Sequence, residues 1–181
     1  MASALQVTRN MLRVTGPLVD VKAFKEMAES KPEYGNKQVL SFAAFIPVPP
    51  ELITNNYKTE NGSTVIENWC FTHWGTMHDA TNLWFCDSGN SGLGWGTYCI
   101  EFTTCMPPFP VIEAISKKFP LLDVNFGWKY KNPIPDDEFH TKFHVTDDIY
   151  GFEMRNGVTQ PSKWSDLREA IQEEECLCST E

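Results

Sequence analysis

The chain has 181 residues, with 24 acidic and 15 basic side chains, a formal net charge of −9 at pH 7 and a pI near 4.9. A surface this acidic repels phosphate backbones and anionic membranes, so we expect no general affinity for nucleic acid or for a membrane. Hydrophobic residues make up 41% of the chain, which suffices for a core, and no apolar run approaches the roughly 20 residues that cross a bilayer.

The first ten residues lack the apolar stretch of a signal peptide, which predicts a cytoplasmic protein. The six cysteines are scattered along a chain that is large enough to fold without disulfides. We therefore expect reduced thiols and a single domain over residues 1–181.

Residues 6–46 predict a strand, a helix and a second strand. Residues 6–15 are rich in β-branched side chains and end at the turn signal Gly16–Pro17. Apolar residues recur at helical spacing in residues 19–30. Residues 38–46 form an apolar run that ends at a cluster of three prolines, which we interpret as a strand.

Residues 51–92 are polar and rich in turn residues at first, and we call this segment the excursion because it departs from the strand–helix order. Within it, residues 64–76 predict a short helix. Residues 81–86 are then predicted to pair with residues 94–104 as a hairpin. The turn between them, DSGNSG at 87–92, holds residues that tolerate positive φ.

The clearest pattern in the chain lies between residues 94 and 130. Prolines open a helix at residues 111–119, where they fit the first turn, and Pro120 ends it. Residues 121–130 alternate almost strictly between apolar and polar, which is typical of a strand with one buried face. Trp128 belongs to the apolar side, so we expect it to be buried.

The remaining residues, 131–181, predict a C-terminal extension. An acidic, proline-rich loop at 131–138 is followed by a strand at 144–154, which the turn residues Asn156–Gly157 close. Residues 161–176 predict a C-terminal helix, with acidic side chains near its start where the helix dipole favours them.

Without the excursion, the order is strand–helix–strand–strand–helix–strand, which is the ferredoxin-like split βαβ arrangement. We therefore predict an α+β fold with a mostly antiparallel sheet and both main helices on one face. The excursion at about 51–92 and the extension at about 131–181 would be additions to this core. Because that fold serves many unrelated functions, it predicts no activity by itself.

Three segments resemble the YubB or Api-type ferredoxin-like family of bacteriophages and plasmids. They are RNMLRVTGPLVDVKAFKE at 9–26, ENWCFTHWGTMHDA at 67–80 and EFTTCMPPFPVIEAISKKFPLLDVNFGWKY at 101–130. The chain differs from the family pattern at Met77 and His78, where the family has Lys and Trp, and at Met106, near its usual Trp. The resemblance implies a ferredoxin-like fold and an origin on a mobile element. It implies no activity, since the family has none assigned.

Candidate binding residues gather in the excursion and just after it. Trp69, His73, Trp74 and His78 lie within ten residues, beside Asp79, and Trp95 follows the glycine-rich turn. Insertions on a rigid scaffold often carry binding groups, so we predict a ligand site between the excursion and the sheet. It would be lined by some of the residues Trp69, His73, Trp74, His78 and Trp95. The alternative is that the tryptophans only fill the space beneath the excursion and that Asp79 caps local backbone.

We predict no metal site and no cofactor. His73 and His78 are five positions apart, whereas a helix brings residues four apart together. His140 and His144 have the four-residue spacing, but the residues around them favour loop and strand, where that spacing separates side chains by about 13 Å. The glycines at 89–96 lack the Lys-Ser/Thr of a phosphate-binding loop.

We interpret the protein as a non-catalytic binding or accessory protein of a phage or plasmid. Its partner would be a host protein or a small molecule in the host cytoplasm, and a role against host defence fits the resemblance. The alternative is a small enzyme acting on a nucleotide, with His73 or His78 as general acid or base. The oligomeric state does not follow from the sequence.

Overall fold

The computed structural model describes residues 7–29, 39–60, 62–87, 94–130 and 149–160. Within these ranges the fold is α+β, with a six-stranded sheet and four α-helices. Along the chain the elements are β1 (Thr8–Pro17), α1 (Leu18–Ala28), the 3₁₀ helix η1 (Phe42–Ala44), α2 (Pro50–Thr54), α3 (Val65–Trp74), β2 (Thr81–Asp87), β3 (Trp95–Thr104), α4 (Phe109–Lys118), β4 (Asp123–Tyr130), β5 (Ile149–Arg155) and β6 (Val158–Gln160).

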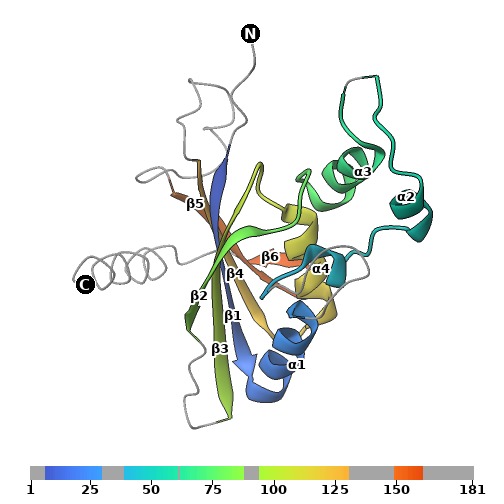
Figure 1. The fold of residues 1–181 in the computed structure, drawn as a ribbon. Helices are drawn as coiled ribbons and strands as arrows, with labels where there is room; N and C mark the ends of the chain where they lie inside the picture. Colours follow the sequence, from blue (N-terminus) through green and yellow to red (C-terminus); the bar gives the residue numbers. More distant parts are fainter. Residues whose placement is uncertain (1–6, 30–38, 61, 88–93, 131–148, 161–181) are drawn as a thin grey trace.

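The sheet has the strand order β2-β3-β1-β4-β5-β6, and every pair of neighbours is antiparallel. Helices α1 and α4 pack on the same face of the sheet, as Figure 1 shows. The ring of Phe24 on α1 lies 5.7 Å from that of Phe119, which ends α4. The antiparallel sheet and the placement of both main helices on one face are therefore confirmed.

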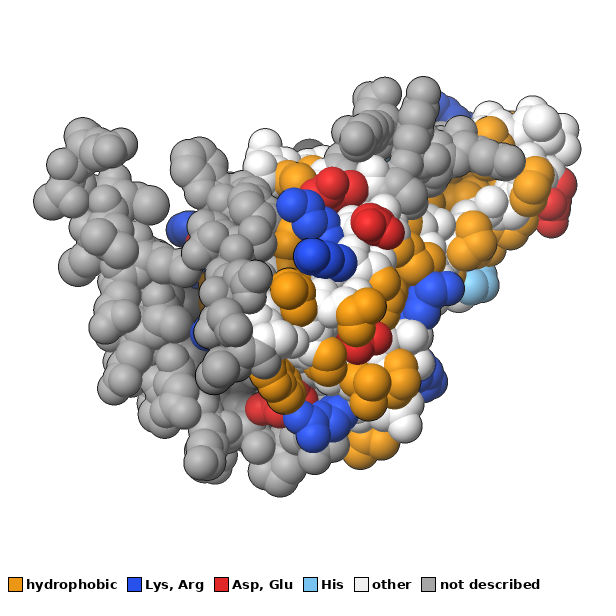
Figure 2. Space-filling model, turned by 90° about the horizontal axis from the view of Figure 1, so that it is seen from below, with side chains coloured by type: hydrophobic (Ala, Val, Ile, Leu, Met, Phe, Trp, Pro, Cys, Tyr) orange, Lys and Arg blue, Asp and Glu red, His pale blue; other side chains and the backbone are white. Residues whose placement is uncertain are grey.

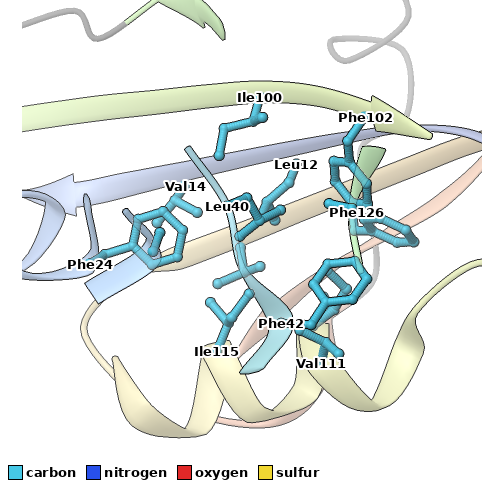
Figure 3. Close-up of a cluster of buried hydrophobic side chains, with 14 of the residues drawn as sticks. Leu12, Val14, Phe24, Leu40, Phe42, Ile100, Phe102, Val111, Ile115 and Phe126 are labelled. Carbon is cyan, nitrogen blue, oxygen red and sulfur yellow. The ribbon is translucent and has the colours of Figure 1, made fainter. Parts of the chain in front are cut away.

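The register of β1 explains why one face of the sheet is apolar. Leu12 is paired with Ile100 of β3 and with Phe126 of β4, so all three side chains point toward the helices. Figure 3 shows them packed against residues of both helices and of the segment after α1. The fully buried members with the largest side chains are Trp74, Tyr98, Phe24, Phe42, Phe102, Phe126, Leu12, Leu40, Ile100, Ile112, Ile115 and Leu122.

The alternation predicted for residues 121–130 is confirmed in β4. Trp128 is only 2% exposed, while the neighbouring Lys129 is exposed to solvent. The Trp128 ring stacks on Tyr150 of β5 at 5.5 Å and receives the edge of Phe109, the first residue of α4, at 4.9 Å. Aromatic packing thus holds the start of α4 against β4 and β5.

The strand predicted at residues 38–46 is wrong. Residues 42–44 form η1, and the backbone N–H of Ser41 donates to the carbonyl of Ala28 at the end of α1. Leu40, Phe42 and Ala43 are buried, but in a tight turn above the sheet rather than in a strand. A short apolar run has the same appearance in a buried strand and in a buried turn. The second strand of the sheet is instead β2, the first arm of the hairpin predicted at 81–104.

The turn between β5 and β6, and its hydrogen bond to α4, complete the described sheet. Asn156 and Gly157 have φ of 49° and 72°, which confirms the turn predicted there. The N–H of Gly157 donates to the hydroxyl of the buried Ser116 on α4 at 2.9 Å, so the β5–β6 hairpin is fastened to that helix. The strand predicted at 144–154 is described from Ile149. The predicted loop at 131–138 and helix at 161–176 lie outside the described residues.

None of the helices in the described ranges is long and apolar enough to cross a membrane.

Truncation of Trp128 should be costly because its ring is buried among four other rings. We expect Trp128→Ala to lower the free energy of unfolding by about 3–5 kcal/mol, measured by urea denaturation. Trp128→Phe, which keeps a ring at this position, should cost clearly less. A Trp128→Ala protein as stable as the wild type would contradict the burial of this side chain.

Candidate functional site

The helix that carries most of the predicted site residues is α3, and its ends are well defined. At its start, the Thr64 hydroxyl accepts from the N–H of Glu67 at 3.1 Å, while the Glu67 carboxylate accepts from the N–H of Thr64 at 2.6 Å. This reciprocal capping box satisfies two backbone donors that would otherwise be unpaired. At its end, Gly75 adopts φ 79°, where a side chain would be strained.

The end of α3 rests on the turn that leads into α4. A Cβ placed on Gly75 would lie 3.1 Å from Cδ of Pro110 and 3.3 Å from the carbonyl oxygen of Pro107. Both the positive φ and this close approach require glycine. The structure therefore places α3 near the end where β3 finishes, projecting away from the sheet as Figure 1 shows.

Trp74 belongs to the core. It shares one stripe of α3 with Ile66 and Cys70, and its side chain is fully buried. Its indole Nε1–H donates to the carbonyl of Ile46 at 2.9 Å, and its ring meets Phe42 edge-on at 5.8 Å. Trp74 therefore fills space in the core, as the alternative from sequence expected for the tryptophans. Its contacts join α3 to residues 42–46.

Trp69 and His73 form a pair at the surface on one flank of α3. Each precedes a buried residue of the stripe by one position, which turns it about 100° toward solvent. The His73 imidazole stacks on the half-buried Trp69 indole at 4.2 Å, with 14° between the planes. Its Nδ1 lies 2.8 Å from the carbonyl oxygen of Trp69. Because a carbonyl only accepts, Nδ1 carries the proton, and in the neutral ring Nε2 holds the lone pair.

His78 lies on the other flank of α3. Its Nε2 is 3.8 Å from a carboxylate oxygen of Glu67, which follows Ile66 of the buried stripe by one position. The backbone hydrogen bond from Thr64 lowers the pKa of Glu67, so this carboxylate stays ionised beside the histidine. The two histidines therefore do not share a site.

Trp95 is far from the other four residues. It opens β3 opposite Pro17, whereas the end of α3 lies beyond the last residue of that strand. Ten strand residues span about 30 Å, so a single small ligand does not reach both. Figure 2 views this end of the molecule, where hydrophobic side chains lie among charged ones. Exposed there are Val19 (74%), Leu121 (62%) and Trp95 itself (48%).

Asp79 is a structural carboxylate. It accepts hydrogen bonds at 2.8 Å from the Ser41 hydroxyl and from the backbone N–H groups of Phe42 and Ala80. The role of a local cap, expected as the alternative from sequence, is confirmed. Burial raises the pKa of Asp79, although the three hydrogen bonds oppose that shift. Its oxygens are engaged in holding η1 to the start of β2.

The described residues contain no cluster of three or more His, Cys, Asp or Glu side chains that could hold a metal. Burial raises the pKa of the Cys70 thiol to about 12, so it is not a nucleophile at neutral pH. His140 and His144 lie outside the described residues.

Sequence reasoning missed Phe71, which is 47% exposed on the same flank of α3 as Glu67. The signal was present, since Phe71 falls one position after Cys70 and therefore outside the buried stripe. The structure thus leaves two exposed aromatic features on α3, one on each side: the Trp69–His73 pair and Phe71.

Comparisons of the chain with protein-family models, curated proteins and solved structures gave no match.

The role of Trp74 in the core can be tested separately from any binding role. Trp74→Phe keeps an aromatic ring but leaves the Ile46 carbonyl without its donor, which should cost about 1–3 kcal/mol of unfolding free energy. Trp69→Phe, at the half-buried position, is the matched control and should cost less. Equal effects of the two substitutions in urea denaturation would contradict the core assignment.

Asp79→Asn should reveal the titration of the buried carboxylate. Because folding raises the pKa of Asp79, the folded state holds this proton more tightly than the unfolded chain does. Its favourable contribution is complete below the ordinary value of 3.8 and is lost as the pH rises through the raised value. The unfolding free energy of the wild type, relative to Asp79→Asn, should therefore fall across that window. A difference that rises with pH would contradict the shift.

Proposed function

We propose that the core is ferredoxin-like and that the chain belongs with the YubB-type proteins of phages and plasmids. The strand order β2-β3-β1-β4, with α1 and α4 on one face, supports the first part. It follows a split βαβ path if residues 39–80 are the insertion, between α1 and β2. The resemblance of residues 9–26, 67–80 and 101–130 to that family supports the second part.

The proposed function is binding without catalysis, by an accessory protein whose partner is a host protein or a small molecule. The observation that carries this proposal is the Trp69–His73 pair. Stacking and the Nδ1 hydrogen bond hold the histidine in one orientation at the surface, which reduces the entropy lost on binding. The pair offers a flat aromatic face and, in the neutral ring, an acceptor at Nε2.

The polar contacts of the histidines favour binding over the enzymatic alternative. Within the described residues, His73 contacts the Trp69 carbonyl and His78 contacts Glu67. General acid–base catalysis usually needs a nucleophile or water position and a second oriented group within hydrogen-bond reach. The two histidines lie on opposite flanks of α3, so they do not supply such a pair to each other.

Ligand screening with paired readouts tests the proposal. We would measure the melting temperature of the wild type with a panel of nucleotides, nucleosides and purified host proteins, and follow each small molecule by mass spectrometry. A hit should raise the melting temperature, stay chemically unchanged and lose at least tenfold in affinity, about 1.4 kcal/mol, in Trp69→Leu and His73→Ala.

Thr72→Ala is the matched control for these variants, because Thr72 is an exposed residue of α3 whose hydroxyl donates to the carbonyl of Asn68 within the same helix. It should bind as the wild type does. Conversion of a panel compound that depends on His73 or His78 would favour the enzyme instead. A ligand whose affinity is unchanged by the Trp69 and His73 variants would place the binding surface elsewhere.

A further inference from the structure

Asn10 is a polar residue buried in the apolar layer between the sheet and the helices. It precedes Leu12 by two positions in β1, so it points to the face of the sheet that α1 and α4 cover. In the register it is paired with Phe102 of β3 and with Trp128 of β4. Asn10 is only 1% exposed, and both of these aromatic neighbours are buried as well. A buried amide group whose donors or acceptor find no partner is costly, so each of its polar atoms needs an account.

The neighbouring oxygen atoms determine which way the Asn10 amide points. Its Nδ2 lies 3.3 Å from the carbonyl oxygen of Thr8, 3.4 Å from that of Phe102 and 2.8 Å from the hydroxyl oxygen of Thr104. Because carbonyl oxygens only accept, the end of the amide that faces them must be the nitrogen. The acceptor Oδ1 is therefore turned away from these three groups.

The two buried hydroxyl groups of this network have no proton left for Oδ1. The Thr104 hydroxyl donates to the carbonyl of Met106 at 2.7 Å. The Thr8 hydroxyl lies 3.1 Å from the carbonyl oxygen of Thr104 and 2.9 Å from its hydroxyl oxygen, and both of these atoms accept from it. Since a hydroxyl has a single proton, neither threonine can also donate to the amide oxygen.

The first turn of α4, which follows this network in the chain, offers no free donor either. The start of a helix normally presents unpaired N–H groups, but Pro108 and Pro110 have none. The N–H of Phe109 donates to the carbonyl of Pro107, and that of Val111 donates to the carbonyl of Pro108, each at 3.0 Å. The proline sequence thus removes the donors that a helix start would supply. Among the described residues, the amide oxygen Oδ1 has no hydrogen-bond partner.

The chemistry of the network selects a small neutral donor as the ligand of Oδ1. Its members carry no charge, so a buried ammonium group or metal cation would lie there without a counter-charge. Water is neutral, has two protons to donate and is the usual partner of buried polar groups that the protein leaves unpaired. The Met106 carbonyl accepts from Thr104 and has a second lone pair, so it can accept the other proton of the same water.

We propose that Asn10 holds one bound water molecule inside the protein, which donates to Oδ1 and to a backbone carbonyl at the end of β3. The water extends the network of Thr8, Asn10 and Thr104, and it joins the start of β1 to the segment that leads into α4. This site is separate from the Trp69–His73 pair on α3 and does not depend on the proposed binding function.

Crystal structures of the wild type and of two variants, at a resolution that shows ordered waters, test this site. The wild-type density should show one water at hydrogen-bond distance from Oδ1, with at least one further protein partner. The peak should be lost in Asn10→Leu, because leucine has a similar size and no acceptor. Thr15→Val removes a hydroxyl from the same strand outside this network and should leave the water in place.

The wild-type structure is decisive even if Asn10→Leu fails to fold. An Oδ1 without a water would overturn the proposal, as would an Oδ1 that accepts from a protein donor or an amide turned the other way. Density too large for a single water would assign the position to a different ligand and overturn it equally. A water that persists unchanged in Asn10→Leu would show that Oδ1 does not hold it.

Discussion

The packing of Phe42 joins the sheet to the inserted helix α3. Its ring meets Trp74 of α3 on one side and Phe102 of the sheet on the other, each at 5.8 Å and nearly edge-on. Asp79 fixes its backbone by accepting from its N–H. Since aromatic rings bury large areas with a preferred geometry, one residue of a short 3₁₀ turn joins the sheet to the inserted helix. This contact, together with the close approach of Gly75 to Pro107 and Pro110, positions α3 and the side chains on it.

The parts of the fold that sequence reasoning predicted well are those with local signals. Prolines framed α4, the alternation over residues 121–130 identified β4, and turn residues located the hairpin arms and Asn156–Gly157. The segment at 38–46 failed because its conformation is decided by distant partners, the carboxylate of Asp79 and the ring of Trp74. The residues of an apolar run do not indicate which distant residues they will contact. Burial of the run could therefore be predicted, but its backbone conformation could not.

The predicted site residues also divide into those that local sequence spacing could place and those that depend on distant parts of the fold. Clustering of aromatic and histidine residues in the excursion pointed to the segment that forms α3, because insertions place such residues together along one element. Helical spacing already separates Trp74, on the buried stripe, from His73, one position before it. Trp95 was grouped with them by residue type, and only the pairing of β3 with β1 shows that it lies at the opposite end of the sheet.

The fold fixes the orientation of the Trp69 and His73 rings before any partner binds. Trp69 is anchored through its edge contact with buried Trp74 at 6.0 Å, and His73 is held by stacking and by the Trp69 carbonyl. A partner at the proposed site would therefore meet an oriented ring rather than a mobile side chain, and less free energy would be lost to ordering on binding.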